Sequence, residues 1–249
     1  MGSTGLAIHH AVCQTIVRVS GSPHAETNAV MLAHSGRLMA GRAPGPMSEL
    51  ARALGDGSAD PELMASAPVT RLGASAMNAL AHAMEALYTP LANPVCSMAA
   101  LRAASLLAEG VTREPPDREA LALGALLAGY ASGATGIAVH HALCQTLVRT
   151  CGTPHAETNA VMLPWSAQLM AERAPEPLEA LAGALGDPDL PAALSRLCAR
   201  SGHVRLRTLG VEEEQLPGVA EAVAAHPLLA NTPEPPEAEE LLALLRDAL

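Results

Sequence analysis

Five side chains of the types that bind metals or move protons lie between residues 78 and 155. Asn78 and His82 are four residues apart, which on a helix puts an amide and an imidazole on one face. His140 and His141 are adjacent. Successive residues of a helix point about 100° apart, so only one of these two can join a given cluster. His155 follows them after a Gly-Thr-Pro turn.

Together these side chains predict an N/O metal site. A tight turn between two helices can bring His141 and His155 together. His155 begins a helix, where the positive end of the dipole disfavours imidazolium and favours the neutral, metal-binding form. One amide and three imidazoles suit zinc, iron(II) or nickel, although the usual carboxylate ligand is missing. Taken alone, Asn-x-x-x-His or His-His is more typical of a polar helix face or a hydrogen-bonded core pair.

The elements that must position these side chains are predicted to be helices. Hydrophobic residues make up 49% of the 249 residues, but aromatic residues only 1%, so the core consists mainly of Ala, Leu, Val and Met. Ala and Leu favour helices, whereas strands favour β-branched and aromatic residues. We therefore expect an all-α bundle, with helices over residues 75–88, 95–111, 117–131, 136–150, 154–173, 176–185, 190–200, 212–225 and 236–248.

A long internal repeat organises the chain. GLAIHHAVCQTIVRVSGSPHAETNAVML, beginning at Gly5, recurs as GIAVHHALCQTLVRTCGTPHAETNAVML, beginning at Gly136, and the likeness continues to residues 56 and 187. Two copies are too few for a solenoid. The first copy predicts three more helices, near residues 5–19, 23–42 and 46–54. Ser22 and Thr153 are each followed by Pro, which predicts a helix N-cap with Pro at the first helical position.

Three regions follow from this pattern. Residues 1–58 form the duplicated helical segment, residues 59–74 a linker, and residues 75–249 the helical domain that binds metal and substrate. The linker is rich in Gly, Pro and Ser, and one short extended stretch is expected around Val69.

Charge and cysteine usage exclude several classes of protein. The net charge is −10 and no basic stripe is present, so we expect no nucleic-acid partner. Five cysteines without a Cys-x-x-Cys pair argue against a disulfide framework and fit a reducing compartment. We find no apolar run long enough to cross a bilayer and no signal peptide, so we expect a cytoplasmic protein with no membrane partner. Large Ala-rich apolar faces predict a homo-oligomer.

The segment SAMNALAHAMEALYTPLANPV resembles the start of the helical domain of iron-containing alcohol dehydrogenases, and GIAVHHALCQTLVRTCGTPHAETNAVMLP resembles their second signature. The His-His and Pro-His-Ala-Glu-Thr forms are most similar to the maleylacetate reductase branch. This resemblance implies the metal-binding helical domain of the dehydroquinate synthase-like fold. It implies a divalent metal, iron or zinc, at Asn78, His82, His141 and His155, with His140 beside the ligands.

The sequence departs from that family in two ways. It contains no Gly-rich phosphate loop and no alternation of strands and helices, so we expect no NAD(P) binding and no hydride transfer by this chain alone. Gln145 stands where the family has a His that faces nicotinamide and substrate, and Gln cannot shuttle protons near neutral pH. Arg149, one turn further, could hold a carboxylate substrate, or simply face solvent.

The first copy repeats two of these histidines as His10 and His24 but has no Asn-x-x-x-His of its own. It is expected to fill space or form an interface; alternatively it completes a partner's site by domain swapping. Glu26 and Glu157 are interpreted as residues of a first helical turn.

Three functions remain open. The first is a repurposed enzyme that performs non-redox chemistry on a small oxo- or hydroxy-carboxylate, with His140, Gln145 and Arg149 as its catalytic or substrate-contacting residues. The second is a non-catalytic scaffold. The third is a split reductase to which another chain supplies NAD(P)H.

Overall fold

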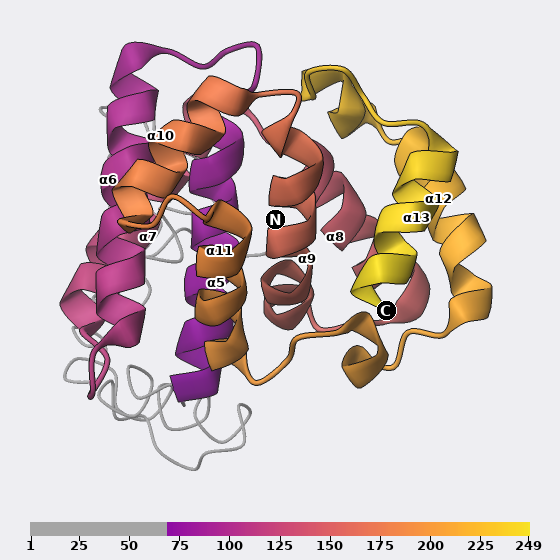
Figure 1. Cartoon of the computed structure of the whole chain (residues 1–249), viewed down its shortest axis with the longest axis horizontal. Helices are drawn as coiled ribbons and strands as arrows, with labels where there is room; N and C mark the ends of the chain where they lie inside the picture. The colour runs from indigo at the N-terminus through magenta and orange to yellow at the C-terminus, as the bar shows by residue number, and fades with distance from the viewer. Residues whose placement is uncertain (1–68) are drawn as a thin grey trace, which may run out of the picture. The chain divides into compact units, whose positions relative to one another are not determined.

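The computed structural model describes residues 69–249, and all the regular elements in this range are helical, which confirms the all-α prediction (Figure 1). The α-helices are α5 (Val69–Ala86), α6 (Pro94–Thr112), α7 (Arg118–Thr135), α8 (Val139–Cys151), α9 (His155–Ala171), α10 (Pro175–Leu185), α11 (Leu190–Cys198), α12 (Leu216–Ala224) and α13 (Ala238–Ala248). Short 3₁₀ helices are η1 (Ala199–Ser201), η2 (Leu206–Leu209), η3 (Glu213–Gln215) and η4 (Pro227–Asn231). The helices predicted within residues 1–58 lie outside the described range.

Most helix ends agree with the prediction to within a few residues, and capping side chains mark the starts of α6, α7 and α11. Asn93 accepts a hydrogen bond from the backbone N–H of Cys96 and begins α6, and Asp117 accepts one from Ala120 and begins α7. Such side chains satisfy amide groups that the first turn leaves without a partner.

The start of α5 is a correction. The sequence predicts a linker to residue 74 with an extended stretch around Val69, but α5 begins at Val69. Gly73 suggested a loop, yet it lies within the helix. A β-carbon at this position would lie 2.8 Å from the carbonyl oxygen of Arg200, so glycine here permits the close approach of η1. Close packing, and not turn formation, accounts for this glycine.

The start of α9 is a second correction. Thr153 does not cap the helix: α9 begins at His155, Pro154 occupies the cap position, and no side chain caps it. The Thr153 hydroxyl instead accepts a hydrogen bond of 2.8 Å from the Thr158 hydroxyl. Thr158 is also within 2.6 Å of the Pro154 carbonyl oxygen. The first turn of α9 is therefore fixed by contacts along its side.

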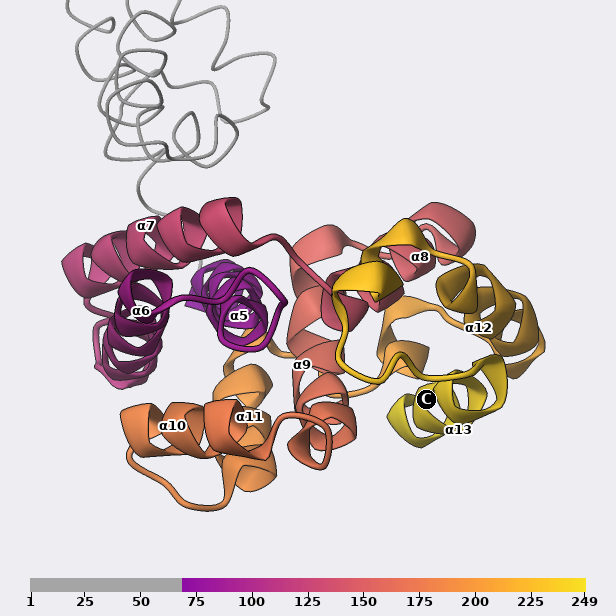
Figure 2. The same ribbon diagram turned by 90° about the horizontal axis from the view of Figure 1, so that it is seen from above.

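Helix α9 is the centre of the bundle. Seen from above, it lies between the group α5, α6 and α7 and the group α8, α12 and α13 (Figure 2), and it packs against α5, α8 and α11. Met77, Leu143 and Met162 are wholly buried around it. Truncating a side chain of this kind typically costs about 2–5 kcal/mol. The predicted core of Ala, Leu and Met thus holds α5, α8 and α9 together, and these helices carry the candidate site.

One helix of the described part, α6, has the length and composition of a membrane span, contrary to the expectation that no apolar run is long enough. Its buried face packs against α5 and α7, and Arg102 and Glu109 lie exposed on its other face. Val95 and Met98 are exposed on it as well, so only part of its apolar surface is packed within the protein.

Candidate metal centre

Helix α5 presents three polar side chains on one face. Asn78, His82 and Glu85 are spaced four and three residues apart, so they lie above one another along the helix. His82 is largely buried and Glu85 is completely buried. The sequence pattern identified the first two but not Glu85.

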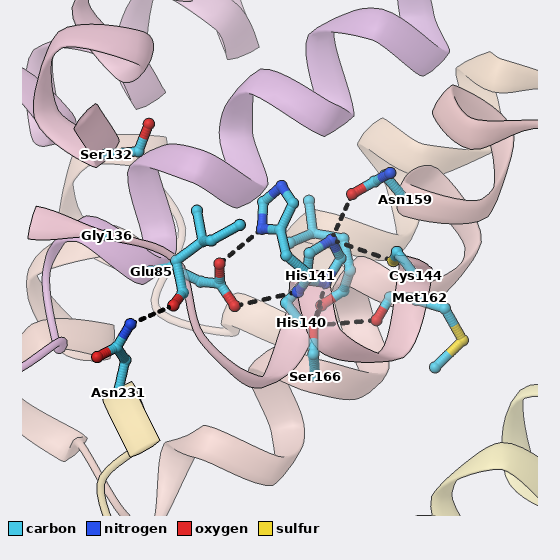
Figure 3. Close-up of polar contacts among 12 residues, drawn as sticks. Glu85, Ser132, Gly136, His140, His141, Cys144, Asn159, Met162, Ser166 and Asn231 are labelled. Atoms are coloured by element: carbon cyan, nitrogen blue, oxygen red, sulfur yellow. Dashed lines mark hydrogen bonds and ion pairs between the residues drawn. The ribbon is translucent and has the colours of Figure 1, made fainter. Parts of the chain in front are cut away.

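The two adjacent histidines of α8 point to different neighbours. The rings of His140 and His141 are inclined at 78° to one another, with centroids 5.2 Å apart. The ring of His141 lies against that of His82, with centroids 4.1 Å apart and planes 31° apart. His141 is thus the residue that joins the α5 cluster, and His140 turns toward α9 (Figure 3).

Glu85 holds His141 in place. Its carboxylate accepts a hydrogen bond of 2.6 Å from Nδ1 of His141 and one of 3.2 Å from the His141 backbone N–H (Figure 3). Burial alone would raise the pKa of Glu85, but the charge and hydrogen bond of His141 more than offset this and lower the pKa to about 2. With the proton on Nδ1, Nε2 of His141 keeps its lone pair, as in carboxylate–histidine–metal arrangements.

Three buried polar atoms of this cluster have no hydrogen-bond partner. They are Oδ1 of Asn78, Nδ1 of His82 and Nε2 of His141. A buried polar atom without a partner is costly, so such atoms typically signal a missing ion, water or ligand. An amide oxygen and imidazole nitrogens are suitable ligands for zinc or iron(II).

The electrostatics of the cluster keep the imidazole of His82 neutral. Burial, together with the neighbouring His141, lowers the pKa of His82 from 6.5 to about 3. Burial and the Glu85 carboxylate raise the pKa of Tyr88 well above its usual value. Near neutral pH the site therefore combines an ionised, buried Glu85 with the neutral imidazole of His82, which favours a bound cation.

His155 occupies the first turn of α9 and is exposed. Burial of part of the ring, together with the nearby His141, lowers its pKa. This interaction puts His155 on the same side of the bundle as the cluster. In residues 69–249, however, no group of three His, Cys, Asp or Glu side chains has the arrangement of a metal site. The structure thus brings Asn78, His82 and His141 together, and the part of His155 as a ligand stays a prediction.

The three residues predicted to touch substrate have different surroundings. His140 is completely buried, with Nδ1 2.7 Å from the Ser166 hydroxyl and Nε2 2.9 Å from Oδ1 of Asn159. This geometry does not support direct contact between His140 and a substrate. Gln145 is half-buried and Arg149 is exposed. The charge of Arg149 contributes, after burial, to a lowered pKa of His226, so Arg149 lies near that residue.

A signal for Glu85 was present in the sequence. It is three residues after His82 and seven after Asn78, and therefore shares their helix face. Its partner could not be read from the sequence, because the contact joins α5 to the start of α8, 56 residues away.

Comparisons with known proteins point to one family. The model of the Fe-containing alcohol dehydrogenase family, C-terminal, matches residues 1–74 and again residues 72–249. The chain is 40% identical over 175 residues to maleylacetate reductase 1 of Rhodococcus opacus, covering 68% of this chain and 49% of that protein. It is 39% identical over 198 residues to maleylacetate reductase of Rhizobium sp. strain MTP-10005, covering 76% and 55%.

Solved structures give the same result. The crystal structure of maleylacetate reductase from Rhizobium sp. strain MTP-10005 matches with a TM-score of 0.70 and 37% identity, over 76% of this chain and 55% of that one. An iron-containing alcohol dehydrogenase from Corynebacterium glutamicum matches with a TM-score of 0.69 and 31% identity over the same shares. The chain spans about half the length of the relatives that it matches.

Proposed function

Because this chain belongs to the iron-containing alcohol dehydrogenase family, we propose that its helical domain holds one divalent metal, zinc or iron, beside a small oxo- or hydroxy-carboxylate and carries out non-redox chemistry on it. The ligands would be Asn78, His82, His141 and His155. The observation that carries the proposal is the set of three unpartnered, buried ligand-type atoms on Asn78, His82 and His141. They lie beside a buried carboxylate whose pKa is about 2.

A metal bound there would supply a Lewis acid for the substrate carbonyl. The chain's own residues supply orientation. Glu85 fixes the ring of His141 and keeps the proton on Nδ1, and the ring of His82 lies against it. Removal of a hydrogen-bond partner of this kind commonly lowers metal affinity or activity by about 10–100-fold.

Substrate recognition is assigned to Gln145 and Arg149 of α8. The amide of Gln145, one helical turn after His141, can donate and accept hydrogen bonds but cannot take up a proton near neutral pH. The guanidinium of Arg149 is exposed and can pair with a carboxylate through two parallel hydrogen bonds. These two residues favour binding and polarisation of an oxo-carboxylate over proton shuttling.

A reductase is the second candidate, and the names of the relatives favour it. Several are maleylacetate reductases. These 249 residues contain no Gly-rich phosphate loop, so in this alternative a nicotinamide cofactor would be held by residues of another chain. A non-catalytic scaffold is the third candidate, and it requires neither metal nor substrate.

The test is calorimetric titration of maleylacetate into the full chain, with and without Zn²⁺, followed by an assay for NADH oxidation. The proposal expects binding that depends on Zn²⁺, no NADH oxidation, and loss of both metal and maleylacetate binding in His141→Ala. NADH oxidation that appears when a dinucleotide-binding partner is added would support the reductase instead. Absence of binding to the Zn²⁺-loaded chain would contradict both and support the scaffold.

A further inference from the structure

A chain of buried hydrogen bonds links α8 to the first turn of α9. The Ser166 hydroxyl lies 2.7 Å from Nδ1 of His140, and Nε2 of His140 lies 2.9 Å from Oδ1 of Asn159. Nδ2 of Asn159 donates to the carbonyl oxygen of His155 at 2.7 Å. His140, Asn159 and Ser166 are all completely buried. Figure 3 shows His140 between Asn159 and Ser166.

The polarity of this chain can be assigned from its last member. Nδ2 of Asn159 donates to the His155 carbonyl, so Oδ1 must be the atom that faces His140 and can only accept. The proton of the His140 ring therefore resides on Nε2. Nδ1 then accepts from the Ser166 hydroxyl at 2.7 Å, a shorter contact than the 3.1 Å from this hydroxyl to the carbonyl oxygens of Met162 and Leu163.

The chain of hydrogen bonds ends at the backbone of a predicted metal ligand. The His155 carbonyl belongs to the first residue of α9, and no side chain caps this helix. Asn159 therefore gives this first turn a hydrogen-bond connection to His140, which is adjacent in sequence to His141. The relative position of His141 and His155 depends on how α8 and α9 are registered, and this connection is one of the contacts that join the two helices.

The internal repeat contains the same three residue types in its first copy. The first copy has His9, Asn28 and Ser35 at the positions that correspond to His140, Asn159 and Ser166. The neighbouring residues differ: Ala33 and His34 occupy the positions of Pro164 and Trp165. The three members of the network are thus the same in both copies even where the residues between them differ.

We propose that His140, Asn159 and Ser166 are positioning residues that orient His155 toward His141 and His82, and that His140 does not itself contact substrate. The connection to metal binding rests on the proposed function. The effect of the network on the position of His155 in the metal-free protein does not rest on the proposed function.

The experiment compares the wild-type chain with Asn159→Leu and Ser166→Ala. Asn159→Leu removes both contacts of the amide, and Ser166→Ala is the milder change if the first variant does not fold. Ser105→Ala is the matched control, because it removes a hydroxyl that donates to the Ala184 carbonyl at 2.9 Å and joins α6 to α10.

The first measurement is ¹H–¹⁵N NMR of the histidine rings in chelator-treated protein. We expect the Nε2–H form of His140 in the wild type. We also expect a displaced His155 ring signal in both network variants and an unchanged one in Ser105→Ala. An Nδ1–H form of His140, or a His155 signal that moves no more than in the control, would overturn the proposal whether or not the chain binds metal.

The second measurement is the affinity for Zn²⁺. If the wild type binds Zn²⁺, the network variants should bind about 10–100-fold more weakly and Ser105→Ala with wild-type affinity. Equal affinity in all variants would overturn the positioning role. A wild type without Zn²⁺ affinity would contradict the proposed function and leave the NMR result to decide the inference.

Discussion

The two adjacent histidines of α8 have opposite environments. His140 has a partner on each ring nitrogen and is completely buried, whereas His141 has Glu85 on Nδ1 and no partner on Nε2. The same contrast separates their surroundings: the polar atoms of Asn159 and Ser166 have hydrogen-bond partners, but Oδ1 of Asn78 and Nδ1 of His82 have none. A polar network whose atoms all have hydrogen-bond partners, here called the saturated side, stabilises and aligns helices. A group of ligand-type atoms without partners, here called the unsaturated side, is suited to a cation. The difference teaches that residue type alone does not identify a ligand.

Removing Glu85 should have the largest effect on stability, because its buried carboxylate accepts both hydrogen bonds from His141. Glu85→Ala leaves the Nδ1–H and backbone N–H of His141 without partners in the core. We expect the free energy of unfolding to fall by about 3–5 kcal/mol, with a smaller loss for Glu85→Gln, which keeps an acceptor. Urea unfolding measures this. Glu109→Ala, an exposed change on α6, is the control, and equal losses in both would remove Glu85 from the account.

Acidification should lower the free energy of unfolding through both His82 and His140. The pKa values of His82 and His140 in the folded protein are about 3 and about 4, below the ordinary value of 6.5. Below about pH 6.5 the unfolded chain therefore binds protons that the folded chain excludes. Stability present above that pH is lost as the pH falls.

Between pH 7 and 5.5 each of these two histidines should remove about 1 kcal/mol from the free energy of unfolding of the chelator-treated protein. Glu85, with a pKa of about 2 against an ordinary 4.5, acts in the same direction in a lower window, below about pH 4.5. Urea titrations at several pH values provide the measurement. Stability that stays constant or rises on acidification to pH 5.5 contradicts neutral, buried imidazoles.

Ser166→Ala should have an intermediate effect confined to the saturated side. Loss of the hydroxyl leaves Nδ1 of His140 without its donor, and we expect a loss of about 1 kcal/mol in unfolding free energy. Thermal or urea unfolding gives the value. If the variant is as stable as the wild type, the contact between Ser166 and His140 contributes nothing to the alignment of the two helices.

Arg149→Ala should have the smallest effect on stability, within about 0.5 kcal/mol, because the side chain is exposed. The expected change is instead a several-fold weaker binding of maleylacetate, measured by calorimetry on the Zn²⁺-loaded chain. Arg102→Ala is the control, because it removes the same charge from an exposed position on α6. Equal affinities in the two variants would assign Arg149 to the solvent-facing alternative.

The sequence predicted the helices well because Ala, Leu and capping residues act locally. It misplaced the start of α5 because Gly73 is dictated by the approach of Arg200, a contact between residues far apart in sequence. It located Asn78 and His82 on one face through their spacing. It could not assign the different roles of His140 and His141, since these depend on which neighbour each ring meets. Glu85 was missed for the same reason.

The predicted lining of the substrate site stays a prediction for Gln145 and Arg149. Their types suggest hydrogen bonding and carboxylate binding, and neither property depends on the fold. What a substrate meets is decided by the orientation of exposed side chains, which spacing does not determine.

Native mass spectrometry of the full chain loaded with Zn²⁺ tests the central claim most directly, because it reports metal and subunit number together. The wild type and His10→Ala, which changes the corresponding histidine of the first copy, should each carry one Zn²⁺ per chain. His141→Ala should carry none. A metal-free wild type, or a His141→Ala variant that retains its Zn²⁺, would contradict a metal site built on the unsaturated side of α8.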